Sequence, residues 1–291
     1  MVILVNHLFN RDCLMNHVLL INCGDEKGLI AKISRTLFEN NLNVMELKEH
    51  VDEASNHFYM RCEFKGQTDL SRMKDQLTSQ LPREAKVTIN PRKKKDIIVF
   101  ATKEHHCLSD ILIRNYFGEL NAEIKCVISN HEDMRGLVEK FNIEYCHIGH
   151  ENKTKEQFEN EILAVAEKHD PDYMVLAKFM RILSPRFVSK FPSRIINIHH
   201  SFLPAFIGAN PYKQAFERGI KIIGATAHFV TDNLDEGPII TQKTNQVDHS
   251  FSADDMKHSG REIERVALAE ALQHAFEDRI FVTGNKTVIF G

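Results

Sequence analysis

The first ninety residues contain apolar runs separated by polar turns, in an order that predicts six elements. A mostly apolar run of strand length at 17–23 is followed by apolar residues spaced three and four apart, the spacing of a helix face. Runs at 42–51 and 57–64 flank a turn and predict a hairpin. A second helical pattern at 70–81 and a short strand at 87–89 complete the order βαββαβ, which is ferredoxin-like.

A different pattern begins at Ile97, where five apolar residues follow one another without alternation. Such strands are buried on both faces, as in parallel sheets. Strand and helix patterns then alternate, which predicts a Rossmann-like α/β domain with a mainly parallel sheet. The polar, proline-containing segment between the two patterns predicts a linker, so we expect domains at 1–90 and 97–291 joined by 91–96. Functional side chains should lie beyond the carboxyl ends of the parallel strands.

Composition and charge exclude several classes of function. The chain has 291 residues, 43% of them hydrophobic, which suffices for buried cores, and its net charge of −3 indicates no nucleic-acid partner. The basic run at 92–95 is typical of a solvated linker. No apolar run reaches the roughly 18 residues of a membrane span, and no signal-peptide pattern precedes the first strand, so we expect a cytoplasmic protein without a membrane partner. The cysteines, which include Cys13, fit no zinc or disulfide framework.

Three polar side chains suggest acyl-transfer chemistry without a protein nucleophile. Asn197 and His199 lie two apart at a strand end and therefore share a face, whereas His200 should point away. Asp235 lies on a turn before another strand. The amide and imidazole can donate to a developing oxyanion, and the carboxylate can hold the histidine and move a proton. The residue types alone leave other interpretations open: a strand-end cap, a satisfied core histidine and a turn residue.

The order of residues around these three resembles the formyltransferase domain of folate enzymes. The motif is N-x-H-x-S-x-L-P, followed by T-x-H and by D-x-G-x-I-I-x-Q, over 195–242, with a turn after Pro204 that includes Gly208. The resemblance implies that Asn197 and His199 polarise the formyl carbonyl and that Asp235 assists proton transfer. It implies folate as substrate and no separate cofactor. Adjacent histidines on opposite faces, with no third ligand at suitable spacing, also argue against a metal site.

The segment 177–184 resembles the wall of the pterin pocket in the same family, and its apolar residues suit a flat ring. The alternative is a strand-to-helix corner packed in the core. For His228, which should support the loop that carries Asp235, the alternative is a buried structural histidine. The substrate-binding residues implied by the resemblance are Phe179, Met180, Arg181, Ile182, Leu183, His228, Asn233 and Leu234.

One segment departs from the family's transferases and predicts the reaction. Those that act on glycinamide ribonucleotide hold its phosphate with a glycine-rich loop after the first strand. Here the corresponding segment, 102–109, has no glycine, and Glu104 would repel a phosphate. We therefore expect the ribonucleotide site to be missing, and if the acceptor amine cannot dock, water becomes the formyl acceptor. A second departure is His200, which replaces a proline of the family.

The turn Asp25-x-x-Gly28-Leu29 and the order of elements around it resemble an ACT domain. The resemblance implies an amino-acid effector at Asp25, Gly28 and Leu29, contacts that form a homo-oligomer, or both. An ACT domain joined to a formyltransferase domain without a phosphate loop resembles the formyltetrahydrofolate deformylase family. This implies a hydrolase that converts 10-formyltetrahydrofolate to formate and tetrahydrofolate, supplies formate to purine synthesis and balances the one-carbon pool. The alternatives are a formyltransferase with an amine acceptor and a non-catalytic sensor.

Overall fold

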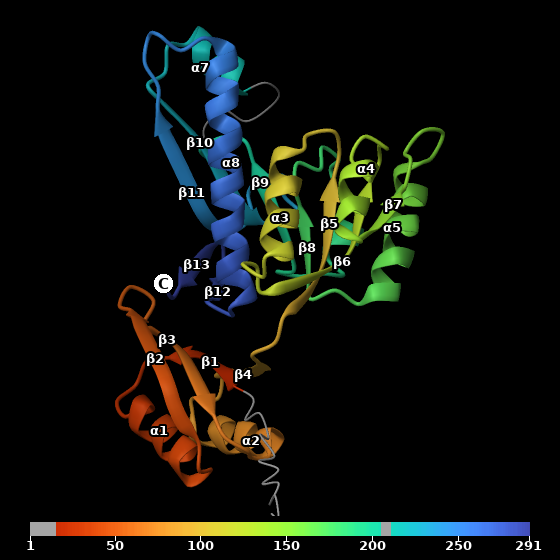
Figure 1. Ribbon diagram of the computed structural model, residues 1–291. Helices are drawn as coiled ribbons and strands as arrows, with labels where there is room; N and C mark the ends of the chain where they lie inside the picture. The colour runs from red at the N-terminus through yellow and green to blue at the C-terminus, as the bar shows by residue number, and fades with distance from the viewer. Residues whose placement is uncertain (1–15, 205–210) are drawn as a thin grey trace, which may run out of the picture. The chain divides into compact units, whose positions relative to one another are not determined.

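The computed structural model describes residues 16–204 and 211–291, which form two compact units divided after Arg92 (Figure 1). Residues 1–15 of the predicted first domain, Cys13 among them, and Gly208 of the predicted turn lie outside the described residues. Every helix in the described ranges is too short or too polar to cross a lipid bilayer.

The first unit is a four-stranded antiparallel sheet with strand order β2-β3-β1-β4 and two helices. Alternate residues of β3, including Phe58 and Met60, pack with Leu29 and Ile33 of the first helix in one core. The predicted ferredoxin-like order is therefore confirmed. The elements are β1 (Asn16–Gly24), α1 (Leu29–Glu39), β2 (Asn43–Asp52), β3 (His57–Lys65), α2 (Leu70–Gln80) and β4 (Lys86–Pro91).

The second unit is built on a seven-stranded sheet of order β11-β10-β9-β8-β5-β6-β7. The five strands from β9 to β7 are parallel, and β10 and β11 are antiparallel additions at one edge, so the predicted mainly parallel sheet is confirmed. The strands are β5 (Lys95–Ala101), β6 (Ala122–Ser129), β7 (Glu144–His147), β8 (Tyr173–Leu176), β9 (Ile195–His199), β10 (Ile222–Phe229) and β11 (Ile239–Gln246), with β12 (Ile280–Thr283) and β13 (Lys286–Ile289) as a separate hairpin.

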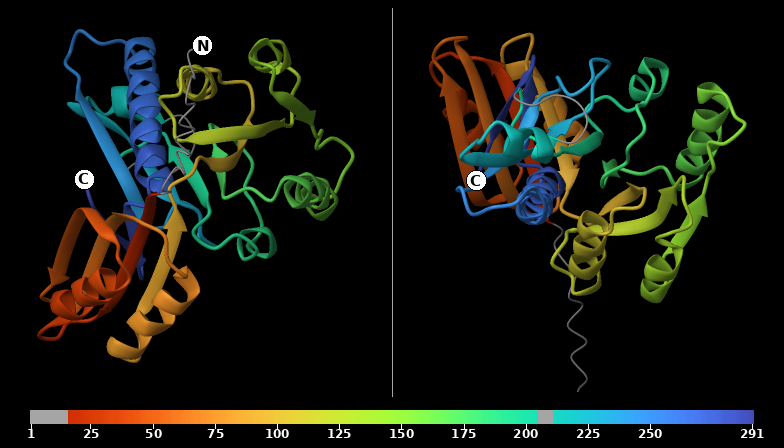
Figure 2. Two further views of the ribbon diagram at one scale, coloured as in Figure 1. Left: turned by 60° about the horizontal axis from the view of Figure 1, so that its bottom comes forward. Right: turned by 90° about the horizontal axis from the view of Figure 1, so that it is seen from above.

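Helices cover both faces of this sheet (Figure 2). The apolar run of β5 is buried on both sides because Val99 faces the layer of α3 and α8, whereas Phe100 faces α5 and α6. The long helix α8 was not predicted. The helices are α3 (His106–Tyr116), α4 (Arg135–Val138), η1 (Glu139–Phe141), α5 (Lys155–His169), α6 (Pro185–Val188), α7 (Pro211–Glu217) and α8 (Ala253–Phe276).

The segment between the two sheets is shorter than the predicted linker 91–96. β4 ends at Pro91 and β5 begins at Lys95. Lys95 is buried, and its ammonium lies 2.8 Å from a carboxylate oxygen of Asp278. This pairing explains how a lysine of the basic run is part of a buried strand rather than of a solvated segment.

Candidate active site

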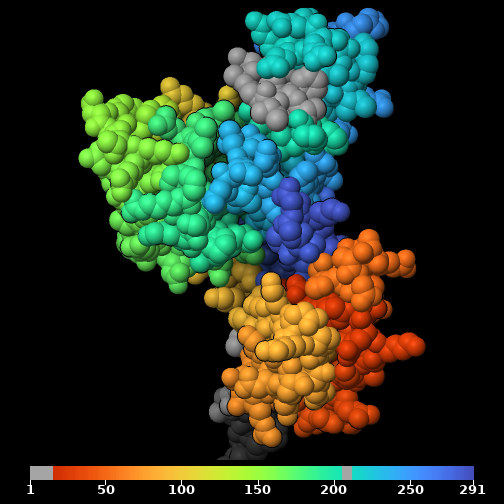
Figure 3. Space-filling model, turned by 180° about the vertical axis from the view of Figure 1, so that it is seen from behind, coloured from red at the N-terminus to blue at the C-terminus, as the bar shows by residue number. Residues whose placement is uncertain are grey.

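A cavity of about 760 Å³ lies beyond the carboxyl ends of β5, β8 and β9. Its walls also include the loop after β10 and one face of α8. In the space-filling view, the light-blue segment after β10 lies beside the green segment after β8 (Figure 3). The cavity is therefore at the edge of the sheet where a parallel α/β fold places functional residues.

All the residues predicted for catalysis and substrate binding line this one cavity. The three predicted catalytic residues come from β9 and from the turn after β10, and the predicted substrate-binding residues come from the segments after β8 and around β10. They are Asn197, His199, Asp235, Phe179, Met180, Arg181, Ile182, Leu183, His228, Asn233 and Leu234.

His199 and Asp235 form a hydrogen-bonded pair. The Nδ1 atom of His199 lies 3.2 Å from Oδ2 of Asp235, and the imidazole is only 6% exposed. Partial burial alone would raise the pKa of Asp235, but the hydrogen bond and the nearby charge of His199 lower it below its usual value. The carboxylate therefore accepts the Nδ1 proton, and Nε2 of His199 is left buried without a hydrogen-bond partner.

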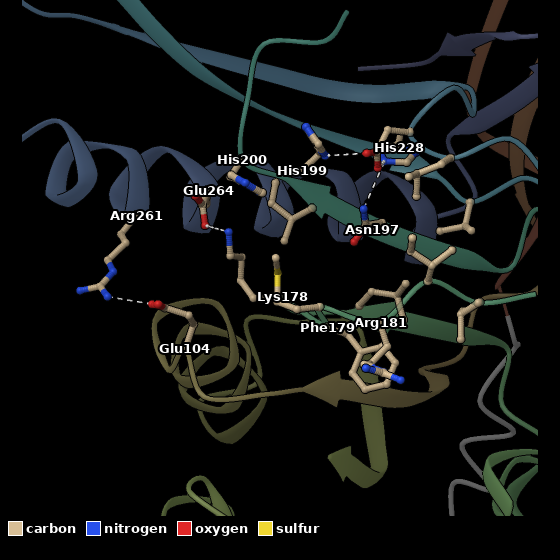
Figure 4. A pocket seen from close by; sticks show the side chains of 18 of the residues that line it. Glu104, Lys178, Phe179, Arg181, Asn197, His199, His200, His228, Arg261 and Glu264 are labelled. Carbon is tan, nitrogen blue, oxygen red and sulfur yellow. Dashed lines mark hydrogen bonds and ion pairs between the residues drawn. The ribbon is translucent and has the colours of Figure 1, made fainter. Parts of the chain in front are cut away.

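His228 fixes the orientation of the Asn197 amide (Figure 4). Nδ1 of His228 lies 2.9 Å from the carbonyl oxygen of Phe229, which can only accept, so this nitrogen carries the proton. Burial lowers the pKa of His228 and favours the neutral ring, whose Nε2 is then an acceptor. Nδ2 of Asn197, at 3.3 Å, must donate to it. The second amide proton of Asn197 remains available to the cavity.

The other polar residues of the sequence motif hold the backbone in place. The Thr226 hydroxyl donates to the Ser201 carbonyl and accepts from the backbone N–H of Leu203, at 2.9 and 3.1 Å. The amide of Gln242 donates to both Leu203 O and Thr226 Oγ1. After the Asp235 turn, a Cβ at Gly237 would lie 1.8 Å from the carbonyl oxygen of Phe229, so only glycine fits there.

The apolar wall of the cavity is attached to helix α5. Phe179 packs edge-on against Phe100 and stacks on Phe158, with ring centroids 5.3 and 6.5 Å apart. The side chain of Glu159 accepts hydrogen bonds from both the backbone N–H and the hydroxyl of Ser184, which ends the segment. Between these anchors, Met180 and Ile182 leave more than half of their side-chain surface exposed toward the opening. We call this wall the apolar arm: Leu176, Phe179, Met180, Ile182, Leu183, Val230 and Leu234.

The prediction that His200 points away from the site is wrong. Its ring stacks on that of His199, with centroids 5.0 Å apart, and it lines the same cavity. Strand β9 ends at His199, so the alternation of a strand no longer applies to the next residue. Burial and the charge of Lys178 lower the pKa of His200 to about 4, which keeps the ring neutral.

A network of charged side chains that the sequence did not predict forms the other end of the cavity. The Glu264 carboxylate, 1% exposed, lies 2.7 Å from Nε2 of His106, 3.2 Å from Nζ of Lys178 and 2.7 Å from the Tyr212 hydroxyl, which donates to it. Burial alone would raise the pKa of Glu264, but the bonds from His106, Lys178 and Tyr212 lower it to about 2. We call this end the charged arm: Glu104, His106, Lys178, His200, Tyr212, Arg261 and Glu264.

Glu104 lies in the segment that corresponds to the phosphate-binding loop of the ribonucleotide transferases. Its carboxylate lies 2.8 Å from a guanidinium nitrogen of Arg261 on α8. His106, at the first position of α3, is committed to Glu264. Arg261 and His106 therefore both have carboxylate partners.

One group of described residues has the composition of a metal site. The ligand atoms of His106, Cys107 and Glu264 lie within 4.8 Å of one another. However, the ammonium of Lys178 already lies against the shared carboxylate, and burial raises the pKa of the Cys107 thiol well above its usual value. A buried thiol that resists ionisation and a fixed cation beside Glu264 do not suit a metal ion.

In the first unit, the predicted effector residues surround the turn between β1 and α1. Gly28 has φ 91°, a left-handed conformation, and caps α1 without a side-chain hydrogen bond. The backbone N–H of Asp25 donates to Asn56 O at 2.9 Å. Leu29 is buried in the core, so it could offer only its backbone to a ligand.

Comparisons with known proteins agree with this architecture. Residues 17–81 match the ACT domain, and residues 95–272 match the formyl transferase family. A formyltetrahydrofolate deformylase of Haemophilus influenzae is 48% identical over 94% of this chain and 98% of its own. The crystal structure of a formyltetrahydrofolate deformylase from Pseudomonas syringae superposes with a TM-score of 0.91 at 39% identity, covering 97% of this chain and 96% of that one.

A crystal structure of glycinamide ribonucleotide transformylase 1 from Symbiobacterium toebii also matches, with a TM-score of 0.65 and 29% identity. It covers 69% of this chain and 95% of its own. Nearly the whole length of this chain, by contrast, matches the deformylases. The chain therefore belongs to the formyl transferase family and, within it, to the formyltetrahydrofolate deformylases.

Proposed function

We propose that this protein hydrolyses 10-formyltetrahydrofolate to formate and tetrahydrofolate in the cavity of the second unit. The relatives that match over nearly the full chain carry the name of this activity, whereas the transformylase match covers 69% of the chain. These matches favour hydrolysis over transfer to an amine. The fold supplies a cavity large enough for a folate head group, with the His199–Asp235 pair in its wall.

The apolar arm is the proposed pterin site. Phe179 and Leu183 are fixed by packing in the core, and Met180 and Ile182 present apolar surface to the opening. A flat ring bound against these side chains would place the formyl-bearing nitrogen toward Asn197 and His199. Arg181 lies at the rim of the same arm, where its guanidinium could meet the carboxylates of the folate tail.

The proposed mechanism follows from which side-chain atoms of the site have no hydrogen-bond partner among the described residues. Water attacks the formyl carbon, and the unpartnered Nε2 of His199 takes its proton while Asp235 stabilises the resulting imidazolium. The second amide proton of Asn197 donates to the oxyanion. When the tetrahedral intermediate collapses, the C–N bond breaks, the imidazolium returns its proton to the leaving nitrogen, and the formic acid released loses its remaining acidic proton to solvent to give formate. No covalent enzyme intermediate is needed.

The observation that carries this proposal is the His199–Asp235 hydrogen bond in the wall of the cavity, combined with the absence of a hydrogen-bond partner for Nε2 of His199 among the described residues. We expect Asp235→Asn to reduce formate release at least a hundredfold, because the amide cannot stabilise the imidazolium. Glu236→Gln is the matched control, since Glu236 is an exposed acid on the same turn and does not line the cavity. Equal rates for the two variants, with both folded by circular dichroism, would refute the assigned role of Asp235.

We further propose that the first unit binds an amino acid at the turn 25–29 and pairs with copies of itself. The uncapped N-terminus of α1 offers backbone N–H groups to a carboxylate. To test effector binding, each of the twenty amino acids is added in turn to the assay of formate release. To test self-association, the oligomer size is measured by sedimentation. In Gly28→Ala, which strains a left-handed position, the ratio of rates with and without the active amino acid should approach one. A response that survives in this variant would locate the effector elsewhere.

A further inference from the structure

Lys178 has an unusual backbone conformation. Its φ is 63°, in the left-handed region that favours glycine and that few other residues adopt. Its carbonyl accepts a hydrogen bond from the Thr102 hydroxyl at 2.8 Å, which fixes the turn after β8. A lysine at a position suited to glycine implies that its side chain has a use of its own.

Neighbouring side chains fix the Lys178 side chain in one conformation inside the cavity. Lys178 is 8% exposed, and its ammonium lies 3.2 Å from Glu264, which is itself held by His106 and Tyr212. The tyrosine reaches this position because α8 has Gly260 opposite its ring, where a Cβ would lie 2.1 Å from a ring carbon. Three side chains, from α3, α7 and α8, therefore fix the ammonium group, with Glu264 in direct contact.

The fixed ammonium lies at the end of the cavity that contains Glu264 and His200, and the His200 ring stacks on that of His199 (Figure 4). Leu176 of β8 pairs with Asn197 of β9 in parallel register. Lys178 lies two residues after Leu176, and His199 lies two residues after Asn197. Figure 4 shows the Lys178 side chain running from the segment of Phe179 toward Glu264 and His200. The lysine thus lies where the charged arm meets His199 and His200.

We propose that Lys178 is the specificity-determining residue that reserves the acceptor position for water. This inference rests on the proposed hydrolysis. The lysine side chain fills the space that a primary amine would need beside the formyl carbon, and its charge repels an amine that arrives protonated. A water molecule needs only about 30 Å³ and can still enter. An ammonium group has no lone pair, so Lys178 occupies this space without acting as a nucleophile.

The transformylase structure that matches this chain bears on the choice between water and an amine as the formyl acceptor. It has the same fold over 69% of this chain, so the fold alone does not decide between water and an amine. Aminolysis would require the same steps as hydrolysis: an amine nitrogen attacks the formyl carbon, the C–N bond to the pterin side breaks, and the amine proton passes through His199 to the leaving nitrogen. Its products are a formamide and tetrahydrofolate.

The test is the partition of formyl groups between water and glycinamide. The full-length protein is incubated with 10-formyltetrahydrofolate and glycinamide at pH 8, where an α-amino group with a pKa of about 8 is partly unprotonated. Formate and N-formylglycinamide are both quantified. We expect almost only formate from the unmodified protein and from Lys190→Ala, which removes a surface lysine. In Lys178→Gly the ratio of formylglycinamide to formate should rise at least tenfold.

A second variant allows the same measurement if Lys178→Gly does not fold. Lys178→Gly leaves Glu264 without its cation, so Lys178→Gly combined with Glu264→Gln removes both charges and keeps the Tyr212 bond. If either variant folds and binds tetrahydrofolate, an unchanged partition ratio, or loss of hydrolysis with no formylglycinamide, overturns the role of Lys178. If the unmodified protein releases no formate at all, the proposed hydrolysis fails instead, and the two failures are distinguishable.

Discussion

The apolar and charged arms of the cavity are built in opposite ways. Most of the apolar arm comes from one continuous segment after β8, attached at Phe179 and Ser184 to α5, with exposed side chains between the anchors. The charged arm combines residues from the loop before α3, α3, the turn after β8, the end of β9, α7 and α8, and most of them are joined by ion pairs and hydrogen bonds. A binding surface for a ring can be local, whereas a rigid polar network requires partners from distant parts of the chain.

The two arms meet at the proposed catalytic residues, so the largest effect is expected there. Asn197→Ala removes the one amide donor that His228 orients toward the cavity. Loss of such a donor typically costs ~2.7–4 kcal/mol of transition-state stabilisation, about a hundredfold to a thousandfold in kcat. Steady-state kinetics should show this loss with KM little changed. A variant with reduced affinity but undiminished kcat would place Asn197 in ground-state binding only.

In the charged arm, we expect a change in stability. Glu264→Gln leaves Lys178 buried without a counter-charge, and breaking such a pair costs about 3–5 kcal/mol. Urea unfolding at pH 7 measures the difference. The network lowers the pKa of Glu264 to about 2 from an ordinary 4.5, so its contribution is present above pH 4.5 and is lost as the pH falls toward 2.

The gap in unfolding free energy between the unmodified protein and Glu264→Gln should therefore narrow as the pH is lowered from about 5 to about 3. Glu262→Gln is the control, because Glu262 lies on the same helix with its side chain mostly exposed. A gap that widens in acid would contradict the ion-paired carboxylate.

The smallest effect is expected in the apolar arm. Ile182 is 62% exposed, so Ile182→Ala should change the free energy of unfolding by less than about 0.5 kcal/mol. Loss of its contact with the ring should raise KM by about fivefold to tenfold, equivalent to about 1–1.4 kcal/mol, with kcat nearly unchanged. Ile113→Ala, at a comparably exposed position on α3 outside the cavity, is the matched control. Equal KM values for the two variants would remove Ile182 from the site.

The same contrast explains what the sequence could predict. The order of elements follows from local periodicity, and the apolar arm and the three polar residues lie in short motifs whose spacing is preserved in the fold. The charged arm has no such signature, because Glu264 is one acid of an unpredicted helix, and the burial and backbone angle of Lys178 appear only in the structure. The prediction for His200 is wrong because β9, and with it the alternation of side chains, ends at His199.

Whether water is the formyl acceptor is decided by complete conversion of 10-formyltetrahydrofolate by the purified protein with no amine present. We expect one formate and one tetrahydrofolate for each substrate consumed over many turnovers, and the same formate yield in a parallel reaction that contains glycinamide. If the substrate instead persists until an amine is supplied, water is not the acceptor, and the cavity belongs to a transferase.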